Sequence, residues 1–197
     1  MNLKIFLLLL SATLVGTGIW LKVEDRKAIL AEVEAYKMWS PDFDLNAVAE
    51  ILVKTNTESL LIKKSAETWM IGDANPQTAD ITTIGHLVQR IKNLKPTEEV
   101  LATRAQFSTF EVLEPDGHSQ GTGTLIELRD KESKRLAAIV IGKQSFAQPD
   151  PRSPFPPPPN GRFVVPAASN GPVGIIAEGF DSIRAKAEAW VQNTQAP

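Results

Sequence analysis

The clearest hydrophobic periodicity in the chain lies in residues 80–94. Apolar side chains recur there at spacings of three and four, at Ile81, Ile84, Leu87, Val88, Ile91 and Leu94. This spacing places them on one face of a helix. Thr78 or Asp80 can cap its first turn through a side-chain oxygen, and Pro96 ends it. The pattern predicts an amphipathic helix that covers a sheet.

Two residues inside this helix need a separate interpretation. Gly85 costs about 1 kcal/mol relative to alanine in a helix interior, so we expect it to allow close packing on the sheet. His86 adjoins the apolar stripe. We interpret it as a residue at the edge of the core, in preference to a ligand.

Short apolar or alternating runs bounded by turn residues predict strands on both sides of the helix. We expect strands at residues 48–54, 59–64, 68–71, 124–129, 136–141, 162–165 and 173–177, and a further strand or extended segment at residues 98–103. The first three form a meander whose apolar face the helix covers. The dipeptide Gly142-Lys143 ends the hairpin made by residues 124–129 and 136–141.

Two further segments complete the predicted fold. Residues 104–110 read as a short irregular or helical turn, with Phe107 and Phe110 in the core. Residues 180–191 read as a C-terminal helix with Ile183, Ala187 and Trp190 on one face. The fold class predicted is α+β: an antiparallel sheet of hairpins and a meander, one main covering helix and one C-terminal helix.

A proline-rich stretch interrupts this pattern at residues 149–160. Seven of the eleven residues from 149 to 159 are proline. Such a stretch favours an extended polyproline conformation, which could serve as a docking ligand for an aromatic groove. A stiff surface loop within the domain is the interpretation we favour. If the stretch binds a partner, the candidate interaction residues are Pro154, Phe155, Pro156 and Pro157, with Trp69 as a candidate elsewhere.

The amino-terminal residues 5–21 form an almost unbroken apolar run after Lys4. A bilayer-spanning helix needs roughly 17–25 residues. A cleaved secretory signal has a shorter apolar core followed by a small-residue site, which Gly16-Thr17-Gly18 resembles only poorly. We therefore favour an uncleaved transmembrane anchor, with Trp20 at the membrane interface.

Helical spacing continues past the anchor, and we expect a solvated stalk at residues 22–42. The chain is thus divided into an anchor (1–21), this stalk, an α+β domain (43–192) and a tail (193–197). Lysine and arginine residues after the anchor favour a cytoplasmic domain, but long domains translocate largely regardless of charge. We predict a single-pass protein of the inner membrane with its domain in the periplasm.

Composition removes several classes of function. A net charge of −2 argues against nucleic acid binding, and the absence of cysteine excludes disulfides and thiolate chemistry. Asp42, Asp44 and Asn46 begin a calcium-loop pattern, but Ala47 and Val53 occupy its essential glycine and glutamate positions. No nucleophile elbow or phosphate-binding loop is present. We predict no catalytic, cofactor-binding or metal-binding residues, and a protein that is not an enzyme.

The order of parts from residue 43 onward resembles bacterial domain-of-unknown-function family 4340. The features that carry the resemblance are the Trp69 strand, Pro76 and Ala79-Asp80 before the helix, the run from Leu136 to Lys143, and Val173-Gly-Ile-Ile176. It spans about residues 44–191. The resemblance implies one membrane segment, an extracytoplasmic α+β domain and, in some members, association with gliding-type ABC transporter components. Many members continue into a second, similar half, whereas this chain has one.

Two hypotheses about function follow. The first is a non-catalytic, membrane-anchored accessory subunit of an envelope complex, with ABC transporter-type subunits as partners. The alternative is an extracytoplasmic domain that binds a glycan, a peptide or a small molecule in a groove beside Trp69 or the proline-rich stretch.

Overall fold

The structure, a computed structural model, describes residues 39, 41–72, 76–177, 180 and 182–191 of the chain. All of them belong to one compact unit, Trp39–Pro197. The predicted anchor, almost all of the predicted stalk and the predicted tail lie outside the described residues. Their orientation and localisation therefore stay predictions.

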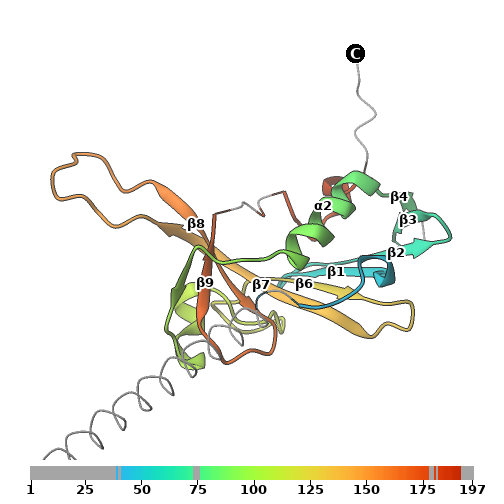
Figure 1. Cartoon of the computed structure of the whole chain (residues 1–197), viewed down its shortest axis with the longest axis horizontal. Helices are drawn as coiled ribbons and strands as arrows, with labels where there is room; N and C mark the ends of the chain where they lie inside the picture. Colours follow the sequence, from blue (N-terminus) through green and yellow to red (C-terminus); the bar gives the residue numbers. More distant parts are fainter. Residues whose placement is uncertain (1–38, 40, 73–75, 178–179, 181, 192–197) are drawn as a thin grey trace, which may run out of the picture. The chain divides into compact units, whose positions relative to one another are not determined.

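Nine strands form one antiparallel sheet in the described part of the chain (Figure 1). Their order across the sheet is β4-β3-β2-β1-β6-β7-β8-β9-β5. The bounds are β1 Glu50–Lys54, β2 Ser59–Ser65, β3 Thr68–Ile71, β4 Gln77–Thr78, β5 Glu98–Val100, β6 Thr124–Arg129, β7 Arg135–Phe146, β8 Pro159–Pro166 and β9 Val173–Ile176. The predicted meander of three strands is confirmed as β1–β2–β3, and the α+β class with a dominant antiparallel sheet is confirmed with it.

The strand register assigns the buried side chains to two faces. Ile51 lies opposite both Ile62 and Leu128, and Ile126 lies opposite Val53 and Ile139. Because side chains alternate along a strand, these residues share one face, which we call the helix face. Leu125 and Val140 are also opposite one another but point to the other face, which we call the η2 face. Both faces carry buried apolar residues, so both need a cover.

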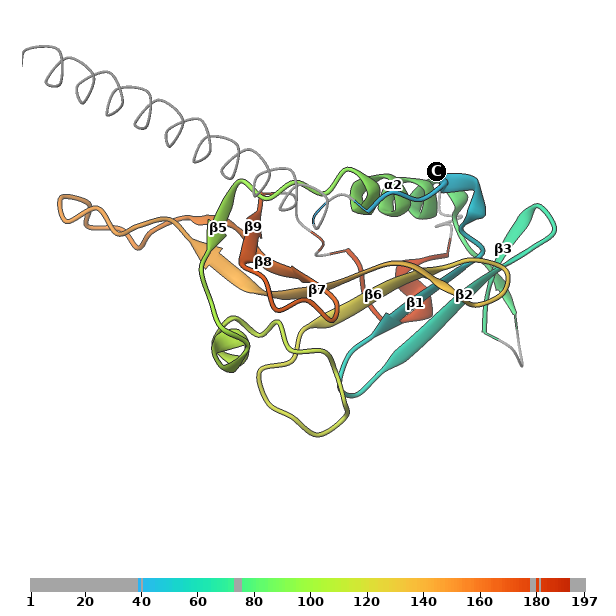
Figure 2. The ribbon, with the colours of Figure 1, turned by 60° about the horizontal axis from the view of Figure 1, so that its bottom comes forward.

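The helix face is covered by α2, Ile81–Lys92 (Figure 2). Strands β4 and β5 occupy opposite edges of the sheet, so the connection that contains α2 must cross it. The buried residues of α2 are Ile84, Leu87, Val88 and Ile91. Of the two predicted caps, the structure selects Asp80, whose carboxylate oxygens accept hydrogen bonds from the Thr82 and Thr83 amides at 3.0 and 3.3 Å.

The η2 face is covered by the return connection from β5 to β6. It contains the 3-10 helix η2, Arg104–Phe110. Phe107 and Val112 from this connection pack with Leu125, Val140, Val165 and Val173 of the sheet into one buried cluster, with Phe110 partly buried beside it. The predicted helical turn at residues 104–110 is confirmed, and so is the place of Phe107 in the core, whereas Phe110 is only partly buried at its edge.

The predicted C-terminal helix is wrong. In residues 180 and 182–191 the only helical segment is the 3-10 turn η3, Ala187–Ala189. Phe180, Ile183 and Trp190 are nevertheless buried. The Trp190 carbonyl accepts the Asp80 amide at 2.7 Å, and Val191 forms an antiparallel bridge with Ala79. An irregular path lets this segment reach the start of α2, and the hydrogen bonds and burial there outweigh its helical periodicity.

Trp39 joins the start of the described domain to the edge strand β5 and its neighbour β9. Its indole Nε1 donates to Glu99 Oε1 at 2.6 Å. Its ring lies against the backbone of Gly174, where an added Cβ would stand 2.8 Å from Trp39 Cη2 and 2.9 Å from Pro96 Cβ. Gly174 is therefore required by close packing.

We predict that Gly174→Ala lowers the free energy of unfolding by about 1–3 kcal/mol, the usual cost of overpacking. Gly85→Ala is the matched control. A Cβ at Gly85 meets no atom within 4 Å, so alanine should raise stability by about 0.5–1 kcal/mol through helix propensity. Denaturant titration of both variants measures the difference. Equal stabilities for the two would contradict the packing assigned to Trp39.

Candidate functional site

Strands β7 and β8 extend into a two-stranded arm beyond the rest of the sheet (Figure 1). Gly142-Lys143 follows the last residue of β7 that pairs with β6, so the predicted end of that hairpin is confirmed, but β7 itself continues past the predicted strand end to Phe146. Pairing with β6 stops at Ile141, and pairing of β8 with β9 begins at Arg162. Beyond these points β7 and β8 pair only with each other, out to Phe146 opposite Pro159. We call residues 144–161 the arm.

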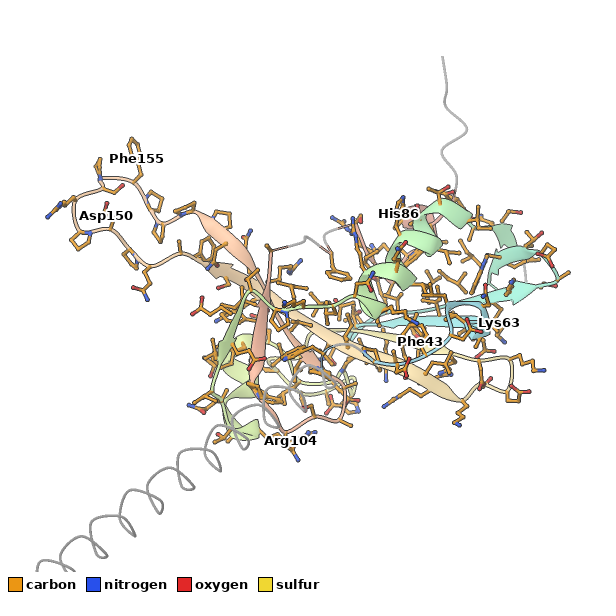
Figure 3. All side chains as sticks on the ribbon, viewed as in Figure 1. Phe43, Lys63, His86, Arg104, Asp150 and Phe155 are labelled. Carbon is orange, nitrogen blue, oxygen red and sulfur yellow. The ribbon has the colours of Figure 1, made fainter. Side chains whose placement is uncertain are left out.

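The proline-rich stretch forms the tip of this arm. Local hydrogen bonds shape the tip: the Asp150 carboxylate accepts the Arg152 amide at 2.9 Å, and Ser153 Oγ accepts the Phe155 amide at 3.2 Å. Phe155 is 77% exposed and points away from the loop (Figure 3). Pro154 and Pro156 are exposed, and Pro157 is half-buried. The preferred prediction of a surface loop is confirmed for residues 149–158, whereas Pro159 and Asn160 belong to β8.

The prolines have a direct structural consequence for the arm. Pro156 to Pro159 lack amide hydrogens, so this part of the arm cannot donate backbone hydrogen bonds to another strand. Proline at an exposed edge is a common way to prevent unwanted strand pairing. The prolines thus disfavour pairing of another strand along this side of the arm.

Trp69, the other candidate interaction residue, lies far from the arm. It belongs to β3, which is separated from β7 by three strands, and Figures 1 and 2 place β3 and the arm at opposite ends of the sheet. Trp69 is buried and lies on the helix face. The structure therefore does not bring the predicted interaction residues into one site.

Trp69 does line an open groove between α2 and the 3-10 helix η1, Leu45–Ala47. The groove has a volume of about 470 Å³. Lys92 donates to the Phe43 carbonyl, and its ammonium lies 5.4 Å from the centre of the Phe43 ring, so the chain leading into η1 is fastened to α2. The two walls of the groove are thus held in place by direct contacts.

Two predictions about α2 are corrected at this groove. Ile81 was expected in the core stripe, yet it is 64% exposed on the groove wall. Gly85 was expected to touch the sheet, but it faces open space in the same groove. Periodicity identifies one side of a helix, whereas the extent of the sheet beneath it is a tertiary property. His86, which was predicted at the edge of the core, is exposed beside them.

The titratable groups with shifted pKa values have structural explanations. Hydrogen bonds from Thr83 and Thr82 lower the pKa of the Asp80 cap. Hydrogen bonds from Ser119 and His118 lower the pKa of Asp116, which lies in the connection between η2 and β6. None of these residues, Thr82 apart, lines the groove. A perturbed pKa inside a cleft can mark a catalytic residue. The shifts of Asp80 and Asp116 instead follow from local hydrogen bonds at a helix cap and a loop.

Glu127 is a buried carboxylate on the η2 face. It accepts hydrogen bonds from Arg129 Nε at 2.8 Å and Arg135 Nη2 at 2.9 Å. Burial raises its pKa, but the two arginines outweigh burial and hold the pKa below the ordinary value of 4.5. The Glu127 side chain is 6% exposed, against 26% for Arg129 and 45% for Arg135, so the arginines form its solvent-facing cover.

Within the described ranges, no group of three or more His, Asp or Glu side chains is placed to hold a metal ion. No helix among the same residues is long and apolar enough to cross a membrane. Comparisons of the chain with protein-family models, curated proteins and solved structures found no match. Membership of family 4340 therefore stays a prediction.

We predict that Glu127→Gln lowers the free energy of unfolding by about 1–2 kcal/mol at neutral pH, because two charge-assisted hydrogen bonds are weakened. The loss is no larger because both arginines are partly exposed and can hydrogen-bond to water instead. The folded-state pKa is lowered, so the stabilisation is present above pH 4.5 and is lost as the pH falls through the folded-state value. Urea titrations of both proteins across this range test it. A stability difference that persisted unchanged in acid would contradict the ionic origin.

Proposed function

We propose that this protein is a non-catalytic interaction subunit that contacts a partner protein through the tip of its arm. The observation that supports this is the exposure of Phe155 at the end of a projecting hairpin. Keeping a large aromatic ring in water is unfavourable, and a buried aromatic side chain contributes strongly to a protein interface. Phe146, also on the arm, is a second large apolar side chain that is exposed, at 55%.

The conformation of the arm favours binding as well. Four consecutive prolines and the Asp150 turn restrict the conformations of the free tip. A tip that is already ordered loses less conformational entropy when a partner binds it. The tip therefore resembles a preformed peptide ligand, and the partner would supply an apolar pocket for Phe155.

We place this subunit in the cell envelope. The apolar residues 5–21 support a membrane anchor, and the resemblance to family 4340 supports an extracytoplasmic domain. The same resemblance suggests subunits of an ABC-type, gliding-like transporter as the partner. The alternative, a domain that binds a small molecule, a glycan or a peptide, has an observation of its own in the groove beside Trp69.

We predict that Phe155→Ser reduces recovery of the partner at least tenfold when the full chain is affinity-purified from detergent-solubilised native membranes. Mass spectrometry of the co-purified proteins provides the measurement. Leu101→Ser is the matched control, because Leu101 is 91% exposed but lies outside the arm. The control should leave recovery unchanged.

A photo-reactive amino acid in place of Phe155 gives an independent test in intact cells. We expect one discrete cross-linked product at this position and none at Glu132, an exposed residue of the β6–β7 turn. Transporter subunits in the product would support the envelope assignment. A chain that purifies alone and gives no cross-link at the tip would overturn the proposed function.

A further inference from the structure

The groove between η1 and α2 exposes apolar side chains on both of its walls. Leu45 of η1 is 42% exposed, and Ile81 of α2 is 64% exposed. Between the walls, Val48 and Trp69 contribute buried apolar surface. Isolated exposed apolar residues are ordinary, but two that face one concave surface mark a place where an apolar group can be received.

Gly85 keeps the middle of this groove open. It lies in the centre of α2, where almost any larger side chain would be a better helix former. No atom stands within 4 Å of the position a Cβ would take. The open space therefore belongs to the groove. Glycine lowers the stability of the helix at the position beside which a bound side chain would lie.

The polar groups of the groove favour one sign of charge. Lys64 of β2 and His86 of α2 line it, and no carboxylate side chain of the described domain is among its lining residues. Asp44 and Asp80, adjacent in sequence to Leu45 and Ile81, direct their oxygens to backbone amides at the starts of η1 and α2. The ammonium of Lys64 thus attracts a negatively charged group, and no lining carboxylate repels it.

We propose that this groove binds a short acidic peptide segment of another protein, with an aliphatic side chain beside Gly85 and a carboxylate near Lys64. Its open form fits a peptide that runs between two helical walls and buries alternate side chains. A volume of about 470 Å³ accommodates a few side chains. This site is separate from the arm and does not depend on the function proposed for it.

Fluorescence anisotropy with labelled synthetic peptides and the purified full chain tests the site. The first peptide alternates leucine with glutamate. A second has lysine in place of glutamate, and a third has serine in place of leucine. We expect the first to bind at least tenfold more tightly than the others. Equal binding of the glutamate and lysine peptides would overturn the proposal.

Three variants locate the binding in the groove, and two of them alter its apolar surface. Ile81→Glu places a negative charge on the wall and should weaken binding at least tenfold; acidic residues suit the first turn of a helix, so folding is preserved. Gly85→Leu fills the groove and should lower affinity similarly while the thermal midpoint holds or rises, because leucine is the better helix former. Retained affinity in either variant would contradict the assignment.

The third variant, Lys64→Gln, should weaken the glutamate peptide about five- to tenfold. Lys63→Gln is its matched control, since Lys63 is next in the same strand but points to the η2 face, opposite Met70. If both substitutions weakened binding of the glutamate peptide equally, only the net charge of the protein would matter. That result would contradict the proposed contact between Lys64 and the peptide carboxylate. Binding of decanoate, a fatty acid, with no binding of any peptide would also overturn the assignment to a peptide.

Discussion

The burial of the central strands on both faces is the constraint on which the rest of the structure depends. In β6 the consecutive residues Leu125, Ile126, Glu127 and Leu128 are all buried. A strand with this pattern needs a layer above and a layer below. The chain supplies both by placing β4 and β5 at opposite edges of the sheet. Connections between an edge and the next strand must then cross a face, once with α2 and once with η2.

Glu127 shows how the fold accommodates a charge in this arrangement. The η2 connection packs over β6 to β9, whereas Leu52, Leu61 and Met70 on the same face of the β1–β3 meander stay half-buried. Glu127 is paired with Leu52 of β1 and Ala138 of β7 in the sheet register. Two arginines shield it with their side chains, so charged residues complete a cover that apolar residues only partly provide.

Both candidate surfaces arise where an element extends past its own packing. The arm exists because β7 and β8 are longer than the strands beside them, which leaves Phe146 and Phe155 exposed beyond the body of the sheet. The groove exists because Ile81 and Leu45 stand on facing walls that nothing in the described domain fills. A stable body thus presents an extended contact at one end and a concave one at the other, and the two can be tested independently.

The sequence alone determined the local elements whose signals lie within a few residues. The spacing of Ile84, Leu87, Val88 and Ile91 predicted α2 to within about two residues, and Asp80 was one of two candidate caps. The three strands of the β1–β2–β3 meander were equally clear, because each depends on turn chemistry and alternation in a short window.

Tertiary structure decided what depends on residues distant in the chain. Residues 180–191 have helical periodicity, but contacts with Ala79 and Asp80 hold them in another path. The length of β7 depends on its partner β8 and not on Gly142. The exposure of Ile81, the open space at Gly85 and the separation of Trp69 from Phe155 depend on where the sheet ends. Local patterns specify which conformation a segment prefers, whereas burial is set by whatever else the chain brings against it.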